Sequence, residues 1–204
     1  MRNFTPAFAV LISTTILLNS CAVSKNSIDR TQTETTTVNE TAAPCFVRLN
    51  DGTIRQFTTL RLVTGLLTTP HLLGDGKVVI TAKEIIAYQN ERHYAVSEKI
   101  LTSKKKANVS VQTLPGFAVK ILSGKLNVYC RKYYNGANTS DEYFLQNGND
   151  GYIIAYSKDA LKTMLKEDAK ALEFFNSKAK VSPKAKKILA AVEMYNNSQL
   201  MTKN

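Results

Sequence analysis

The sequence predicts an α+β fold, in which a β-rich antiparallel meander of about eight strands is followed by two C-terminal helices. Between residues 44 and 156, short runs rich in β-branched and aromatic residues are separated by turn sequences containing Gly and Asn. From Ser157 onward the apolar residues recur every three or four positions, which is the spacing of one helix face. The hydrophobic content of 44% is sufficient for the core of one ordinary globular domain.

The strands are predicted from alternation and from the turns between them. Strand-like segments occupy residues 45–49, 54–63, 77–80, 84–89, 93–96, 117–122, 125–133, 143–145 and 152–156. The turn sequences are Asn50-Asp51-Gly52, Gly74-Asp75-Gly76, Leu114-Pro115-Gly116, Ser123-Gly124 and Asn147-Gly148-Asn149-Asp150-Gly151. Such turns favour hairpins between consecutive strands. Residues 66–73 are apolar but contain Pro70, which favours a loop or an edge strand because proline donates no backbone hydrogen bond.

The strand at 125–133 has a predicted division of faces. Leu126, Val128 and Cys130 fall on one side, and Asn127, Tyr129 and Arg131 fall on the other. We therefore expect Cys130 to face the same side as the apolar residues.

The first helix is predicted to begin at Ser157, a good N-cap, with Asp159 favourably placed in its first turn. The second is predicted to begin at Ser182-Pro183, because a capping residue before proline is a common helix start. The apolar stripe of the first comprises Ala160, Leu161, Met164, Leu165 and Leu172, and that of the second comprises Ile188, Leu189, Val192 and Tyr195. We expect the helices to cover one face or one edge of the sheet.

The amino terminus has the pattern of an export signal. Arg2 precedes an apolar run from Phe4 to Leu18, which spans about 15 residues and is short of the roughly 20 needed to cross a bilayer. A polar segment without a stop-transfer pattern follows this run. Residues 1–20 are therefore predicted to be removed as a signal peptide.

The end of this run, Leu18-Asn19-Ser20-Cys21, resembles the lipobox of bacterial lipoproteins. Leu18 is the branched apolar residue, Ser20 is the small residue before the cysteine, and Asn19 is less usual at its position. The resemblance covers the first 21 residues. It implies that Cys21 takes a diacylglycerol through its sulfur and that the chain is cut before it. Two acyl chains give stable anchoring, since each buried methylene contributes about 0.8 kcal/mol. The alternative is an ordinary secretory signal with a chance cysteine.

The segment from the lipidation site to the domain is predicted to be a tether. Residues 21–43 are rich in Thr and Ser and hold few core-forming side chains, so we expect them to be disordered. The predicted globular domain occupies residues 44–204. Ala22, next to the lipidated cysteine, carries no inner-membrane retention signal, which favours the outer membrane of a bacterial cell envelope.

Cys45 and Cys130 remain as an even pair in a compartment that can oxidise thiols. Two interpretations stay open at this point. The pair could form a disulfide between two strands, or each thiol could be buried separately as a small apolar side chain.

Catalytic and metal-binding patterns are scarce. His71 and His93 have no partner at metal-ligand spacing, and the sequence has neither a Gly-x-Ser-x-Gly elbow nor a phosphate-binding loop. We therefore predict no enzyme activity, no metal site and no cofactor. The alternative is an envelope enzyme acting on carbohydrate or peptide, with His93 or His71 in its site.

Two groups of residues suggest binding. Tyr129, Arg131 and Tyr133 interleave aromatic and basic residues, as a ligand-binding face or simply the outward side of a hairpin would. The second group is a lysine-rich segment at 178–187, which is either a binding surface or a solvated helix face. A net charge of +11 favours anionic envelope polymers as partners, whereas export argues against nucleic acid.

The leading hypothesis is a lipid-anchored envelope lipoprotein whose domain binds or scaffolds another molecule without catalysis. In its overall pattern the chain is similar to uncharacterised lipoproteins of Bacteroidetes-type bacteria. That similarity carries no catalytic residues. A second alternative to this hypothesis is a cationic binder of anionic envelope surfaces.

Overall fold

The structure is a computed structural model that describes residues 44–65, 67–102, 112–134, 138–177 and 184–201. Every described residue belongs to one compact unit of the chain, Glu40–Asn204. The predicted signal peptide, Cys21 and the predicted tether lie outside the described residues.

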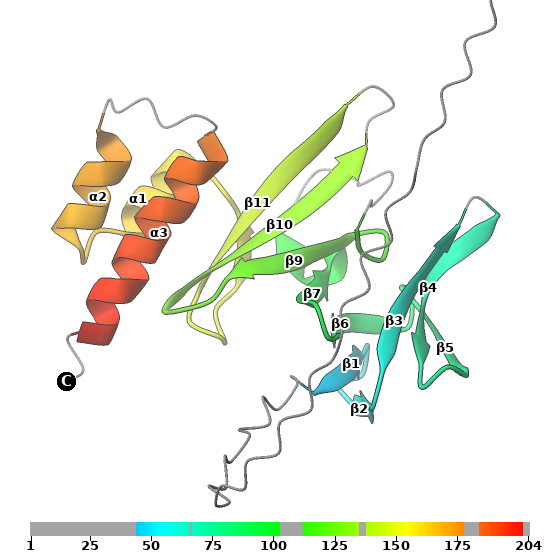
Figure 1. The fold of residues 1–204 in the computed structure, drawn as a ribbon. Helices are drawn as coiled ribbons and strands as arrows, with labels where there is room; N and C mark the ends of the chain where they lie inside the picture. Colours follow the sequence, from blue (N-terminus) through cyan, green and yellow to red (C-terminus); the bar gives the residue numbers. More distant parts are fainter. Residues whose placement is uncertain (1–43, 66, 103–111, 135–137, 178–183, 202–204) are drawn as a thin grey trace, which may run out of the picture. The chain divides into compact units, whose positions relative to one another are not determined.

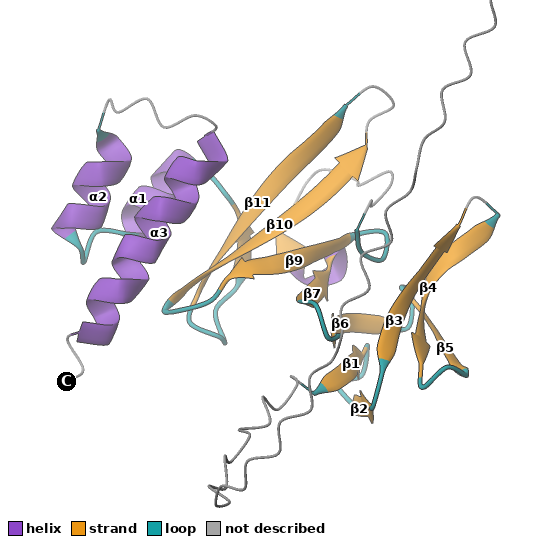
Figure 2. Ribbon diagram, viewed as in Figure 1, coloured by secondary structure: helices purple, strands orange, loops and turns teal. Residues whose placement is uncertain are grey.

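The described residues form twelve strands, one short 3-10 helix and three α-helices (Figure 2). The strands are β1 (Cys45–Leu49), β2 (Ile54–Phe57), β3 (Leu60–Gly65), β4 (Thr68–Gly74), β5 (Val78–Thr81), β6 (Ile85–Gln89), β7 (Tyr94–Ser97), β8 (Leu101–Thr102), β9 (Phe117–Leu122), β10 (Leu126–Tyr134), β11 (Thr139–Asn147) and β12 (Ile153–Ala155). The helices are η1 (Glu98–Ile100), α1 (Lys158–Met164), α2 (Ala169–Asn176) and α3 (Lys184–Met201). This confirms the predicted α+β class, with more strands and one more α-helix than expected.

Nine strands form one sheet in the order β2-β1-β6-β7-β9-β10-β11-β12-β8. Figure 1 labels these strands apart from β12 and β8. Neighbouring strands in this sheet are antiparallel, except for β12 and β8, which pair in parallel. The predicted hairpins β1–β2, β6–β7, β9–β10 and β11–β12 are confirmed. The remaining three strands form a second antiparallel sheet in the order β3-β4-β5.

The prediction of one continuous β-segment at 54–63 is wrong, because the chain changes sheets between β2 and β3. The backbone N–H groups of Thr58 and Thr59 both donate to Oδ1 of Asp75, each over 2.9 Å. Asp75 thus satisfies the backbone at the corner, from a position far along the chain. No pattern among neighbouring residues of the sequence indicates this long-range contact.

The interpretation of residues 66–73 as a loop or an edge is also wrong, since β4 is the central strand of the small sheet. Pro70 is tolerated because of its place in the two ladders. On one side it lies opposite an irregularity between Val63 and Gly65 of β3, and on the other the pairing with β5 begins only at His71. Its missing N–H therefore falls where regular ladder bonds are interrupted.

The first predicted helix is two helices. Ser157 caps α1 as expected, its Oγ accepting from the N–H of Ala160 over 3.0 Å. Asp168 then begins α2, its Oδ1 accepting from the N–H of Ala171 over 2.9 Å. The predicted start of the last helix at Ser182-Pro183 lies outside the described residues.

The two faces of the nine-stranded sheet bury different clusters. We call the face with Tyr88, Phe117, Val128 and Leu145 the outer face. Two separate layers cover different parts of it. The small sheet packs over β1, β6, β7 and β9, whereas the helices pack over β10 and β11 (Figure 1). Ile188, Val192 and Tyr195 are buried in the helical layer, which confirms the predicted stripe.

The opposite, inner face buries a cluster drawn from the sheet alone. Its buried members are Ala87, Val96, Leu101, Ala118, Tyr129, Phe144 and Ile153, one from each of seven strands. A sheet that buries one of its faces against its own strands must curl around that face. In the described part of the chain, no helix is both long and apolar enough to cross a bilayer.

Candidate functional site

A cleft lies on the outer face between its two covering layers. One cavity of about 360 Å³ has a floor of Val119, Ile121, Cys130 and Tyr143, and Leu189 of α3 lines it from the helical layer. Polar side chains also line it, from His93, Gln112, Thr113, Lys132 and Asp141.

A second cavity, of about 580 Å³, adjoins the first and is more polar. It lies between β3 and the turn that joins β6 to β7, and its charged residues are Arg61, Glu91 and Arg92. The two cavities share His93 and Gln112. We call the combined space the His93 cleft.

Strand pairing explains how the floor is assembled. In the ladder between β10 and β11, Cys130 lies opposite Tyr143 and Lys132 lies opposite Asp141. The hydroxyl of Tyr143 donates to Oδ2 of Asp141 over 3.1 Å. The floor thus combines an apolar centre with a polar rim of both charge signs, which is typical of a site that orients a small ligand.

His93 is held in place by its own turn. Oδ1 of the buried Asn90 accepts from the N–H groups of Arg92 and His93, each over 2.9 Å. The imidazole Nε2 lies 3.0 Å from the hydroxyl oxygen of Tyr88. Burial, assisted by the charge of Arg92, lowers the pKa of His93, so the ring is neutral at neutral pH.

Cys130 is a poor nucleophile despite its place in the cleft. Burial, with a further contribution from the Asp141 carboxylate, raises its pKa to about 11. The thiol is therefore protonated at neutral pH, whereas nucleophilic cysteines require a thiolate. The prediction that Cys130 faces the side of Leu126 and Val128 agrees with its place on the outer face.

The structure leaves Cys45 and Cys130 as two free, buried thiols. Cys45 lies on β1 in the cluster under the small sheet, and β6, β7 and β9 separate that strand from β10. Of the two interpretations left open by the sequence, two separate buried thiols describes the structure, and a disulfide between Cys45 and Cys130 does not.

The predicted outward-facing patch of Tyr129 and Arg131 is wrong, because the sheet curls around the face that carries them. Their side chains are 2% and 1% exposed. The guanidinium of Arg131 donates from Nε and Nη2 to Oε2 of Glu142, over 3.1 and 2.5 Å, and from Nη1 to Glu98 over 3.2 Å. The hydroxyl of Tyr129 donates to Oε1 of Gln146 over 2.6 Å. The side chain of Tyr133 is not among those that the structure describes.

The two histidines are not brought together. His71 lies on β4, where its Nδ1 is 2.9 Å from the carbonyl oxygen of Thr69, and it does not line either cavity of the cleft. Among the described side chains, no group of three or more His, Cys, Asp or Glu residues could hold a metal ion.

Comparison with protein-family models, with curated proteins and with solved structures finds no match to this chain.

Sequence reasoning singled out His93 and Cys130 but missed the cleft that contains both. Ile121, Asp141 and Tyr143 carry no motif. The available signal was at one end of the outer face, where Lys132 of β10 and Asp141 of β11 interrupt rows of otherwise mainly apolar positions.

Proposed function

We propose that this protein is an envelope lipoprotein, anchored through acylated Cys21, whose β-rich domain binds a small ligand in the His93 cleft without transforming it. The observation that carries the proposal is the cleft itself, with an apolar floor from three adjoining strands, a polar rim and a second polar cavity beside it. Its first cavity, about 360 Å³, is within the range of small-molecule sites.

The groups in the cleft favour binding over catalysis. A general base of the usual His–carboxylate type would need an acidic partner, whereas the described contact of His93 is with Tyr88. The Cys130 thiol is held in its protonated form. These features support binding over the alternative of an envelope hydrolase.

The lining also indicates the chemistry of the ligand. Val119, Ile121 and Leu189 offer an apolar surface, whereas Arg61 and Arg92 line the adjoining cavity beside the single carboxylate of Glu91. This arrangement suits an amphiphile whose apolar part lies on β9 and whose polar or anionic end reaches the arginines.

Native mass spectrometry of the full-length chain, extracted from its own membranes in mild detergent, tests the binding proposal. Ile121 is 41% exposed and lies on the floor, so Ile121→Gln should remove a co-purifying small molecule without disturbing the core. Val79→Gln is the matched control, because Val79 is an exposed strand residue, 57% accessible, that does not line the cleft. An unliganded wild type, or equal loss in both variants, would contradict the proposal.

The anchor is tested separately. Metabolic labelling with palmitate should label the wild-type protein. Membrane fractionation should then find the labelled protein in the outer-membrane fraction. Cys21→Ala should lose the label and leave an unprocessed leader. Persistent anchoring and processing of Cys21→Ala would contradict the lipoprotein assignment while leaving the cleft proposal intact.

A further inference from the structure

The helical layer contains a basic cavity that shares no lining residue with the His93 cleft. It has a volume of about 470 Å³. Its charged residues are Lys158 and Lys162 of α1 and Lys187 of α3, and its walls include Tyr156, Phe175 and Asn176. We call this space the lysine pocket.

The lysine pocket concentrates positive charge without a carboxylate in its lining. Lys158 and Lys162 are four residues apart on α1, so they share a side of the helix, where like charges repel each other. The ion pairs among the described residues involve Lys125 and Arg131, and neither lysine of α1 takes part in one. An anion in the pocket would remove this repulsion.

Lys187 is fixed at the edge of the pocket. It is half-buried, and its Nζ donates to the carbonyl oxygen of Ser177, the C-cap residue that follows α2. An ammonium group has three donors, so two remain for a ligand. Three lysines together match the charge of close to −2 that a phosphate monoester carries at neutral pH better than the single charge of a carboxylate.

The walls indicate what is attached to the phosphate. Tyr156 and Phe175 are half-buried aromatic residues, and the side chain of Asn176 can both donate and accept hydrogen bonds. Aromatic rings beside an amide suit a ring that has one apolar face and hydroxyl groups at its edge, as a sugar has.

We propose that the lysine pocket binds a phosphorylated sugar, with the phosphate on Lys158, Lys162 and Lys187 and the sugar ring against Tyr156 and Phe175. This inference does not depend on the His93 cleft. It places the expected affinity for anionic envelope polymers at a defined pocket, whereas the sequence alone suggested a diffuse basic segment.

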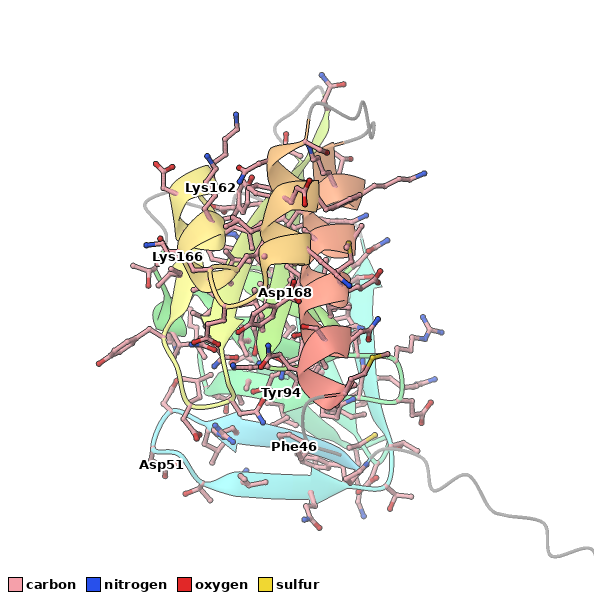
Figure 3. The ribbon with its side chains drawn as sticks, turned by 90° about the vertical axis from the view of Figure 1, so that its left-hand side faces the viewer. Phe46, Asp51, Tyr94, Lys162, Lys166 and Asp168 are labelled. Atoms are coloured by element: carbon pink, nitrogen blue, oxygen red, sulfur yellow. The ribbon has the colours of Figure 1, made fainter. Side chains whose placement is uncertain are left out.

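The test is isothermal titration calorimetry of the full-length chain in mild detergent with glucosamine 1-phosphate as the probe. Lys158→Gln/Lys162→Gln should weaken binding at least tenfold. Lys166→Gln/Lys170→Gln removes the same charge from two exposed lysines outside the pocket and should change the affinity less than twofold. Figure 3 labels Lys162 and Lys166, which represent the two pairs.

Three outcomes would overturn the proposal. They are no binding by the wild type, equal weakening in both double variants, and equal binding of glucosamine, which lacks the phosphate. A titration with micelles of a phosphorylated glucosamine glycolipid identifies the source. Binding of these micelles with the same dependence on Lys158 and Lys162 points to a lipid head group, whereas binding of the soluble probe alone points to a free sugar phosphate.

Discussion

The inner and outer faces of the nine-stranded sheet are buried in different ways. The inner face is closed by the curl of the sheet and contains a charged side chain, Arg131, that is 1% exposed and paired with Glu142. The outer face is covered by two separate layers, a small sheet and a group of helices, and the His93 cleft lies between them. A face closed by its own strands leaves its polar groups to pair with one another, whereas a face covered by two layers can retain a binding cavity where they meet.

The inner face also carries an uncharged polar network. Nδ2 of Asn127 donates to the carbonyl oxygen of Gly148 over 2.7 Å, and Nε2 of Gln146 donates to the carbonyl oxygen of Gly151 over 2.9 Å.

Aromatic rings also contact one another and a lysine. Phe46 and Tyr94, labelled in Figure 3, have ring centroids 6.2 Å apart, and Lys120 Nζ lies 5.1 Å from the Tyr94 centroid. Within the described residues, no buried side-chain nitrogen or oxygen lacks a hydrogen-bond partner.

The largest predicted effect comes from a substitution on the inner face that removes a buried ion pair. Arg131→Met should lower the free energy of unfolding by about 3–5 kcal/mol, because it removes the guanidinium that is paired with the carboxylate of Glu142, which is only 12% exposed. Urea denaturation of the full-length chain measures the effect. Arg131→Met/Glu142→Leu should recover much of the loss, since an apolar pair needs no ionic partner. An equal loss in the single and double variants would show that charge pairing is not what stabilises this face.

The next effect concerns the helical cover of the outer face. Asn196 of α3 bonds to both backbone groups of Leu126 on β10, accepting from the N–H and donating to the carbonyl, each over 2.9 Å. Asn196→Ala should cost about 2–3 kcal/mol of unfolding free energy, because both buried groups lose their partner. Asn197→Ala, at the exposed neighbouring position, should cost less than about 0.5 kcal/mol. Similar unfolding midpoints for the two variants would argue against this attachment.

The third predicted effect is smaller and concerns the N-terminal cap of α2. Asp168, labelled in Figure 3, caps α2, and Asp168→Ala should cost about 1 kcal/mol at pH 7. Hydrogen bonds from Ser198 and from the backbone of Ala171 lower the pKa of Asp168. As the pH falls below about 4, the unfolded chain takes up the proton first, so this stabilisation is lost. The difference between wild type and variant should therefore shrink at pH 3, and a constant difference would contradict the ionic part of the cap.

The smallest predicted effect is a pH dependence at the cleft. The folded pKa of His93 is lowered, so the unfolded chain binds the proton more readily, and stability should fall as the pH drops below about 6.5. One such group gives a slope of at most about 1.4 kcal/mol per pH unit. His93→Gln should flatten the curve of unfolding free energy between pH 6.5 and the folded pKa. An unchanged slope would show that His93 is equally easy to protonate in the folded and unfolded chain.

Local features of the sequence predicted the parts of the fold that depend on local contacts. The hairpin turns at Asn50-Asp51-Gly52 and Ser123-Gly124 and the cap at Ser157 all act within a few residues, and all are found. The errors arose where a distant residue decides the outcome. Asp75 fixes the corner after β2, and the curl of the sheet buries Tyr129 and Arg131, which strand alternation alone placed on a solvent-facing side.

The candidate site was less predictable than the fold. His93 and Cys130 attracted attention as residue types, but their neighbours Ile121 and Tyr143 come from other strands. The cleft depends on where two covering layers stop. Its position follows from long-range packing that no spacing within the sequence encodes.

The most direct test of the binding proposal is a crystal structure of the full-length chain, purified from its native cells without exchange of bound molecules. The account predicts electron density for a small molecule in the cleft, lying on Ile121 and within contact of His93. A cleft that holds solvent alone, or one that α3 side chains fill, would contradict it.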